Sequence, residues 1–386
     1  MQRTEEAMTI PEVFTLLIFI PYLAVIVALS YGWKKARRVR PGVNSAALTT
    51  RISVVIPMRN EGGRLGGLFQ ALMLQDYPGG RWEVIAVNDH SQDSTPEILN
   101  QWANTGKFTL RILENGTDEA GKKAALSRGI ARASGELIVT TDADCRMGRS
   151  WLTRLAAFYE AHRPHLIFGP VLFKEGSPFF FTRLQALEFI TLMATAAGSS
   201  QLGHPVFCNA ANMAFPRHVF LGMDDPLMRN LASGDDTMML LKIKKGDPGK
   251  IAFNPDPEVM VKTEPMTRLR GFWNQRKRWA SKSRHYRDPD ILVTGGVVLL
   301  TNLWLMILIA GVFFSPVLAG PLLAGFTAKT AIDALLVWPA MNHFNKRHLR
   351  WLFIPGQLLY PIYSSLSALA GRVSGFTWKN RHYHVN

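Results

Sequence analysis

Residues 136–145, Glu-Leu-Ile-Val-Thr-Thr-Asp-Ala-Asp-Cys, combine a short β-rich run with two aspartates at its end. Three similar β-rich runs precede it, with helix-forming stretches between them: the runs are Ile52–Pro57, Trp82–Asn88 and Thr109–Leu113, and the stretches are Leu65–Gln75, Ser94–Trp102 and Lys122–Ala133. Strands that alternate with helices predict an α/β fold, in which helices cover both faces of a parallel sheet. Such sheets bind ligands beyond the carboxyl ends of their strands. The residues after each strand are therefore the first candidates for a functional site.

The pair Asp142 and Asp144 is the first such candidate, because it directly ends a β-rich run. Mg²⁺ and Mn²⁺ prefer carboxylate oxygens together with substrate phosphates, and a two-residue step lets both carboxylates reach one diphosphate. A calcium-binding EF-hand loop is the competing interpretation, but the glycine and glutamate that it needs at later positions are missing. The pair therefore predicts a divalent cation bound together with a nucleotide diphosphate.

Polar side chains also follow the first two strands. Pro57, Arg59 and Glu61 lie in the loop after the first strand, where Glu61 or Arg59 would bond a uracil and a ribose, although such residues are also ordinary in loops. Helix capping explains Asp93 in the next loop. It does not explain Asp89, which lies at the strand end itself and can bond the base or the ribose of a nucleotide.

Two further motifs each allow two interpretations. Lys122 opens a helix, and it is either a solvated surface lysine or, if it points toward the sheet end, a ligand of a phosphate, aided by the helix dipole. Asp235 and Asp236 precede an apolar helical segment. They either cap that helix, or repel each other so that one pKa rises, as a general base requires.

The segment Gln275-Arg276-Lys277-Arg278-Trp279 follows these acids and precedes an apolar region. It is either a basic patch beside a membrane or a specific site, because Gln275, Arg278 and Trp279 share roughly one helical face. In a specific site the arginine would offset charge on a leaving diphosphate, and the tryptophan would stack on a sugar or an acceptor.

Together these motifs resemble the membrane branch of the inverting family-2 glycosyltransferases. The resemblance covers about Ile52 to Trp279 and rests on the order and spacing of an early Asp, a DxD, an (E/D)D and a QxxRW motif. It implies a nucleotide-binding GT-A fold and a nucleotide-sugar donor. Residues 207–215 resemble the segment that lines the sugar in this family, with Asn209 where a glycine is usual.

The resemblance also implies a role for each matched residue. Asp89 would bind the uridine and Asp142 the nucleotide-sugar, while Asp144 would hold Mg²⁺ or Mn²⁺. Asp236 would be the general base, next to Asp235. The donor and the acceptor would be bordered by Gln275, Arg278 and Trp279.

Long apolar segments flank this region and predict a membrane protein. Val13 to Trp33 is 21 residues without a charge, enough to cross a bilayer, and it lacks the cleavage site of a signal peptide. Ile291 to Ala328 is charge-free over 38 residues, and Trp351 to Gly371 is a third uncharged stretch. Residues 177–201 are mostly apolar but carry charges, which favours an interfacial helix over a span, with a buried core helix almost as well supported.

The formal charge of +15 is concentrated beside these segments, which favours anionic lipid headgroups over nucleic acid as its partner. Basic residues directly follow the first span and precede the next. The positive-inside rule therefore places the intervening region on the cytoplasmic side of an inner or plasma membrane. We expect a transmembrane anchor over residues 1–40, a GT-A domain with interfacial helices over 50–288, a transmembrane region over 289–372, and a basic tail over 373–386.

The acceptor is either a membrane lipid or a glycan. About four apolar segments offer little material for a polymer channel, and residues 376–383 resemble the tail of ceramide- and hopanoid-type lipid glycosyltransferases. A lipid acceptor is therefore favoured over a processive polysaccharide synthase. A cytoplasmic tail requires an even number of spans after Asp288, and Pro355 and Pro361 could break the last stretch into a re-entrant or interfacial piece. A non-catalytic protein that binds nucleotide-sugar or lipid would be expected to lack one of the acidic motifs, and none is missing.

Overall fold

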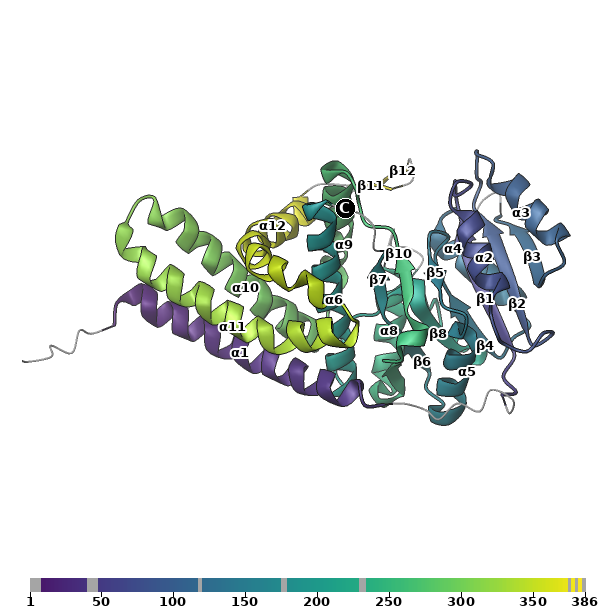
Figure 1. The fold of residues 1–386 in the computed structure, drawn as a ribbon, viewed down its shortest axis with the longest axis horizontal. Helices are drawn as coiled ribbons and strands as arrows, with labels where there is room; N and C mark the ends of the chain where they lie inside the picture. The colour runs from purple at the N-terminus through teal and green to yellow at the C-terminus, as the bar shows by residue number, and fades with distance from the viewer. Residues whose placement is uncertain are drawn as a thin grey trace, which may run out of the picture.

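The computed structural model describes residues 8–39, 48–116, 120–174, 179–228, 234–373, 376–378 and 381–383. An α/β domain forms one end of the molecule and a layer of long helices forms the other (Figure 1). Residues 1–7 and 40 of the expected anchor, and half of the expected basic tail, lie outside the described residues.

The four strands predicted from the sequence lie side by side and parallel, as expected. They are β1 (Ile52–Met58), β2 (Trp82–Asn88), β3 (Thr109–Glu114) and β4 (Leu137–Thr140), in the order β3-β2-β1-β4. β1 and β4 are buried almost throughout, because a parallel sheet covered on both faces needs apolar residues at successive positions. Their carboxyl ends meet at one edge, where the acidic motifs follow.

The second half of the main sheet corrects the expectation of a wholly parallel sheet. β8 (Met213–Pro216) lies antiparallel between β4 and β6 (Leu166–Phe168), and β9 (Ile251–Phe253) pairs parallel with β6. These strands have three or four residues, too few to show a periodic pattern along the chain. A smaller sheet contains β5 (Arg146–Met147), β10 (Val261–Thr263) and β7 (Val171–Phe173).

The predicted helices of the α/β domain form close to their expected bounds. They are α2 (Leu65–Met73), α3 (Thr95–Asn104) and α4 (Lys122–Arg132). α4 packs closely on the sheet, since a Cβ on Gly129 would lie 2.5 Å from a Val55 methyl group. Further helices complete the domain: α5 (Trp151–His162), α7 (Arg217–Leu221), α8 (Asp235–Gly246) and α9 (Leu269–Ser281).

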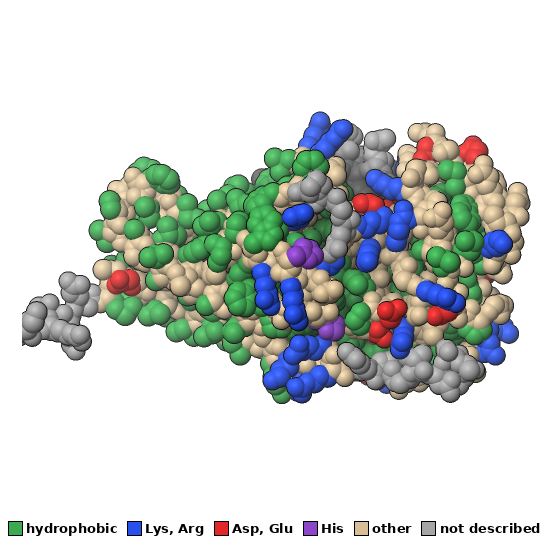
Figure 2. Space-filling view, in the orientation of Figure 1, with side chains coloured by type: hydrophobic (Ala, Val, Ile, Leu, Met, Phe, Trp, Pro, Cys, Tyr) green, Lys and Arg blue, Asp and Glu red, His purple; other side chains and the backbone are tan. Residues whose placement is uncertain are grey.

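Three helices are long and apolar enough to cross a membrane. They are α1 (Ile10–Ala36), α10 (Pro289–Val312) and the segment Pro316–His343, which contains α11 (Ala319–His343). Hydrophobic side chains cover most of this end of the molecule, whereas Lys and Arg gather where it meets the α/β domain (Figure 2). α11 ends against the α/β domain, because His343 Nε2 lies 3.0 Å from the carbonyl oxygen of Pro255.

The apolar segment around residue 190 forms α6 (Phe180–Gln201), which packs against α1, α11 and strands β7 and β9. Its contact with α1 is close enough to exclude any side chain at the crossing, since a Cβ on Gly198 would lie 2.3 Å from the carbonyl oxygen of Leu29. About half of its residues are buried. α6 therefore joins the helical layer to the sheet, as in the buried-helix alternative.

The last apolar stretch forms α12 (Phe353–Val373), which is not one of the three candidate spans. It is a continuous helix, so the expected break at the two prolines is wrong. Pro355 lies in the first turn, where proline is tolerated, and Pro361 is accommodated within the helix. Its last turns contact α9, where a Cβ on Gly371 would lie 2.4 Å from Cβ of Ala280. The strands β11 (Phe376–Trp378) and β12 (Arg381–Tyr383) follow as an antiparallel pair.

Candidate active site

A cavity of about 420 Å³ opens at the carboxyl ends of β1, β2 and β4, and we call it the sheet-end cavity. Every site residue predicted from the sequence lines it. These residues are Pro57, Arg59, Glu61, Asp89, Lys122, Asp142, Asp144, Asn209, Asp235, Asp236, Gln275, Arg278 and Trp279. Residues more than two hundred positions apart in the chain therefore meet in one place.

Asp89 is held in a network of hydrogen bonds at the end of β2. Its Oδ1 accepts from the Asn115 side chain at 3.0 Å and from the backbone N–H of Gly121 at 2.9 Å. The guanidinium of Arg59 donates to the Asp89 carbonyl oxygen at 2.8 Å and lies 3.8 Å from its carboxylate. Asp89 is 3% exposed, so it both orients the start of α4 and presents one edge to the cavity.

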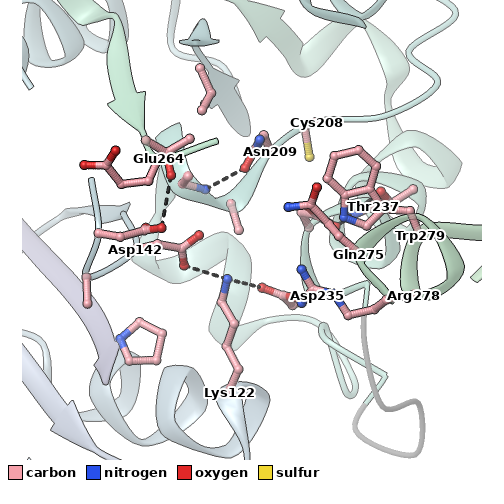
Figure 3. Close-up of a pocket in the computed structure, with 18 of the residues that line it drawn as sticks. Lys122, Asp142, Cys208, Asn209, Asp235, Thr237, Glu264, Gln275, Arg278 and Trp279 are labelled. Atoms are coloured by element: carbon pink, nitrogen blue, oxygen red, sulfur yellow. Dashed lines mark hydrogen bonds and ion pairs between the residues drawn. The ribbon is translucent and has the colours of Figure 1, made fainter. Parts of the chain in front are cut away.

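Lys122, the first residue of α4, points into the cavity rather than into solvent. Its Nζ lies 2.8 Å from Asp142 and 3.5 Å from Asp235, and so bridges two acidic motifs (Figure 3). Burial lowers the pKa of Lys122, but the adjacent carboxylates outweigh this effect and raise it, so the ammonium stays charged. The surface alternative for this lysine is wrong.

The negative charge of Asp144 is less well compensated than that of Asp142, which lies 2.8 Å from Nζ of Lys122. Its Oδ2 accepts a hydrogen bond from the Thr263 hydroxyl at 3.1 Å. Burial, followed by repulsion from Asp142 and Glu61, raises the pKa of Asp144. A bound cation would relieve this repulsion.

The residues at this edge fit a divalent cation that is shared with a substrate. No cluster of three or more His, Cys, Asp and Glu side chains that could hold a metal occurs within the described ranges. Mg²⁺ is commonly bound by one or two carboxylates together with substrate phosphates. Asp142 and Asp144 would supply the carboxylates of such a site, and the remaining positions would belong to a diphosphate.

Asp235 and Asp236 are the first two residues of α8, and the helix is capped by Gly234, which has φ of 90°. Neither acid is therefore the N-cap residue. Burial raises the pKa of Asp235, but Lys122, Lys282 and Lys123 outweigh it and lower the pKa. The rise that we expected from mutual repulsion is thus absent at Asp235, because these lysines surround it.

Asp236 differs from Asp235 in being more exposed to the cavity. Its side chain is 16% exposed, and its Oδ1 accepts from the backbone N–H of Thr237 at 2.7 Å. Nζ of Lys282 lies 3.7 Å from the same oxygen. Asp236 is therefore the carboxylate of the pair with better access to an incoming hydroxyl.

One face of α9 lines the sheet-end cavity, as the helical spacing predicts. Gln275, Arg278 and Trp279 lie together on the side of the cavity near Asp235 (Figure 3). Arg276 does not line the cavity and is 4% exposed, although its guanidinium donates a hydrogen bond to Oε1 of Gln275 at 3.0 Å. Its guanidinium pairs with Glu188 of α6 and lies 4.3 Å from the ring centre of Trp279.

Arg276→Met is expected to destabilise the protein by about 3–5 kcal/mol, because it leaves the Glu188 carboxylate buried without its ion-pair partner. The measurement is the free energy of unfolding of the purified protein in detergent. Arg270→Met is the control, since Arg270 is an exposed residue of the same helix and should change stability by about 0.5 kcal/mol or less. Adding Glu188→Gln to Arg276→Met should recover part of the loss, and equal stability of all variants would contradict the role of this pair.

Several cavity residues had escaped the sequence analysis. Thr263 and Glu264 at the end of β10, and Lys282 and Tyr286 after α9, all line the cavity. Burial and the nearby Asp236 carboxylate raise the pKa of Tyr286, so its hydroxyl stays protonated. A polar pair at a strand end is a signal that could have identified Thr263 and Glu264, whereas Tyr286 lies in a connection without a pattern.

Residues 53–221, just under half of the chain, match the family model described as glycosyl transferase family 2. Glycosyltransferase AglE of Haloferax volcanii is 34% identical over 122 residues, which are 32% of this chain and 40% of the relative. A beta-monoglucosyldiacylglycerol synthase of Synechocystis is 31% identical over 110 residues, which are 28% of this chain and 23% of the relative. The chain therefore spans less than half the length of these two curated relatives.

A solved structure resembles nearly the whole chain. The mannosyltransferase PcManGT from Pyrobaculum calidifontis, in complex with GDP-Man and Mn²⁺, covers 93% of this chain and is itself covered to 99%, with a TM-score of 0.56 and 19% identity. This likeness concerns the fold, which is the α/β GT-A fold with a mixed sheet. Residues 53–221 thus match the glycosyl transferase family 2, and a nucleotide-sugar glycosyltransferase is the class of enzyme that this match and the relatives support.

Proposed function

We propose that this chain is a membrane-bound, inverting glycosyltransferase that transfers a hexose from a nucleotide-sugar to a membrane lipid. One observation carries the proposal: the acids after β2 and β4, the acid pair of α8 and one face of α9 line a single cavity. Carboxylates for a metal-bound diphosphate, a base and cations for a leaving group are the parts that such a transfer needs.

The donor would lie along the strand ends. Arg59, Glu61 and Asp89 would bind its base and ribose, with Pro57 shaping the loop, and Lys122 and Asp142 would lie at the diphosphate. Asn209 would border the sugar. We propose a UDP-hexose, and GDP-mannose is the second donor to test because the similar mannosyltransferase was solved with it.

A cation bound by Asp142 and Asp144, Mg²⁺ or Mn²⁺, would supply positive charge to the diphosphate. The chain's own residues carry out the other roles. Asp236 accepts the proton of the acceptor hydroxyl, whose oxygen attacks the anomeric carbon on the face opposite the diphosphate. Arg278 offsets the charge that develops on the departing group. Gln275 and Trp279 would position the sugar and the acceptor.

Three candidate membrane spans support a cytoplasmic catalytic domain. α1, α10 and α11 are the candidate spans, and α11 ends at the α/β domain. Since α12 is not a candidate span and its last turns contact α9, the count after Asp288 is even, as a cytoplasmic tail requires. The basic residues that follow α1 would face anionic headgroups on that side.

A test of the function is to incubate membranes that contain the full chain with labelled UDP-glucose, UDP-galactose, UDP-N-acetylglucosamine or GDP-mannose. The lipid extract is then separated from insoluble polymer. We expect label from one donor in the lipid extract. Label only in polymer would instead favour a polysaccharide synthase, and label in neither fraction would contradict the proposed transfer.

Donor binding should also depend on pH in a direction set by Asp144. Because the pKa of Asp144 is raised, this carboxyl becomes protonated at a higher pH than an ordinary aspartate, whose pKa is about 3.9. Cation-dependent binding of a nucleoside diphosphate should be complete above the raised pKa and lost as the pH falls through it. Titration calorimetry at several Mn²⁺ concentrations measures this loss. A higher Mn²⁺ concentration should move the midpoint of this pH dependence to lower pH. A midpoint that does not change with Mn²⁺ concentration would contradict metal binding by this carboxylate.

A further inference from the structure

We infer that a second cavity, enclosed by α1, α6, α10, α11 and α12, binds the acceptor as an uncharged lipid that carries a hydrogen-bonding group within its body. This inference rests on the proposed function and names the substrate class of the same site. The cavity has a volume of about 320 Å³, and we call it the helix cavity. Its walls are mostly apolar residues of the helices that would cross or border the membrane.

The helix cavity adjoins the sheet-end cavity. Leu192, Phe207 and Tyr286 line both of them. Tyr286 lies close enough to Asp236 for the carboxylate to raise the pKa of its hydroxyl. A lipid in the helix cavity could therefore present its hydroxyl past Tyr286 to Asp236, while its apolar body stays among the helices.

A cluster of polar side chains from two candidate spans and from α12 lines the helix cavity. Lys329 and Asp333 of α11 form an ion pair at 2.6 Å, Gln357 of α12 bonds both of them, and Tyr22 of α1 donates to Asp333. We call these four residues the Lys329 cluster. Lys329 is 2% exposed, and its Nζ lies 5.4 Å from the ring centre of Tyr360.

Stability alone gives little reason for this cluster. Ionisable residues inside a membrane are costly, and they usually mark a functional site. A buried ion pair can often be replaced by apolar residues of similar volume without loss of stability. The cluster also lines a cavity, and the Asp333 side chain is 12% exposed, so its carboxylate can accept a further hydrogen bond from a ligand.

The charges around the helix cavity argue against a phosphate-bearing acceptor. Three ionised side chains line it, and each has a partner of opposite charge: Lys329 pairs with Asp333, and Glu188 pairs with Arg276. A phosphate placed there would add a negative charge to balanced pairs. Hydroxyl, ester or amide groups can instead exchange hydrogen bonds with the cluster, and these are the polar groups of uncharged lipids.

Two glycines of α10 give a matched test. Gly295 lines the helix cavity and Gly296 does not, and a Cβ on either would meet no atom within 4 Å. Leucine at either position also favours a helix more than glycine does. Gly295→Leu should fill the cavity without disturbing the fold, and Gly296→Leu controls for the added bulk.

The probe is dioleoylglycerol in phosphatidylcholine vesicles, with a polyprenyl phosphate in the same vesicles as the charged comparison. The full chain is repurified after incubation, and the lipid that it retains is measured by mass spectrometry. We expect the wild type and Gly296→Leu to retain the diacylglycerol. The amount retained by Gly295→Leu should be lower by at least about tenfold. Equal retention by Gly295→Leu, preference for the polyprenyl phosphate, or retention of neither lipid would overturn the inference.

The Lys329 cluster is tested by replacing both charges, as Lys329→Met with Asp333→Leu. We expect this variant to unfold at the wild-type temperature, to bind nucleoside diphosphate normally and to lose its preference for diacylglycerol over an alkane of similar length. An unchanged preference would overturn the role of the cluster. A measurement of sugar transfer distinguishes this inference from the proposed function. If diacylglycerol retention depends on Gly295 but no sugar is transferred, only the proposed function is contradicted. If Gly295→Leu transfers sugar at the wild-type rate, only the lipid site in the helix cavity is contradicted.

Discussion

Asp236→Asn is expected to bind the nucleotide-sugar donor with wild-type affinity and to transfer no measurable sugar. The asparagine keeps the shape of the side chain and the hydrogen bond from Thr237, but it cannot accept the proton of the acceptor hydroxyl. Loss of a general base typically lowers the rate by about 10²–10⁴-fold. Donor affinity by calorimetry and initial rates with a lipid acceptor give the two readouts.

Asp235→Asn provides the comparison for this prediction. Asp235 lies 3.5 Å from Lys122, which also bonds Asp142, so its loss should disturb the diphosphate site and weaken donor binding. Asp236→Asn should therefore lower the rate of transfer, whereas Asp235→Asn should lower the affinity for the donor. If Asp236→Asn transferred sugar near the wild-type rate, Asp236 would be excluded as the general base.

Asp144→Asn is expected to abolish cation-dependent donor binding. Burial and the neighbouring carboxylates raise the pKa of Asp144, and a neutral amide there would no longer attract Mg²⁺ or Mn²⁺. We expect the affinity for a nucleoside diphosphate in the presence of Mn²⁺ to fall by at least about 100-fold, since changes beside metal ligands already cost 10–100-fold. Calorimetry with and without Mn²⁺ measures the difference.

Glu264→Gln is the matched control for Asp144→Asn. Glu264 lines the same cavity, but its carboxylate pairs with Lys174. Its loss should leave Mn²⁺-dependent binding in place. If Glu264→Gln abolished that binding and Asp144→Asn did not, the cation would lie at the end of β10 rather than after β4.

The site was more predictable from the sequence than the fold around it. All thirteen predicted site residues line one cavity. They follow a strand, open a helix, share a helical face or match a family motif, and each of these features is read over a short stretch of sequence. The role of each residue remains a prediction. The antiparallel β8 was not predicted, because the partners of a strand are chosen by contacts across the sheet rather than by its own residues.

Helical spacing distinguished the two arginines of the QRKRW segment, because only Arg278 shares a face with Gln275 and Trp279. It did not identify the partner of Arg276, which is buried against Glu188. Glu188 is 88 residues away in the chain, so only the packing of α6 on α9 determines which arginine it binds.

By itself, the sequence determined the four parallel strands, the apolar segments that form α1, α10 and the start of α11, and the acids at the strand ends, since these depend on periodicity and residue type over short stretches. The tertiary structure alone decided that Lys122 bridges two acidic motifs, that α12 stays unbroken and returns to α9, and that two cavities adjoin at Tyr286. These features join segments that are far apart in the chain. They arise from close packing between those segments, which cannot be predicted from a local sequence pattern.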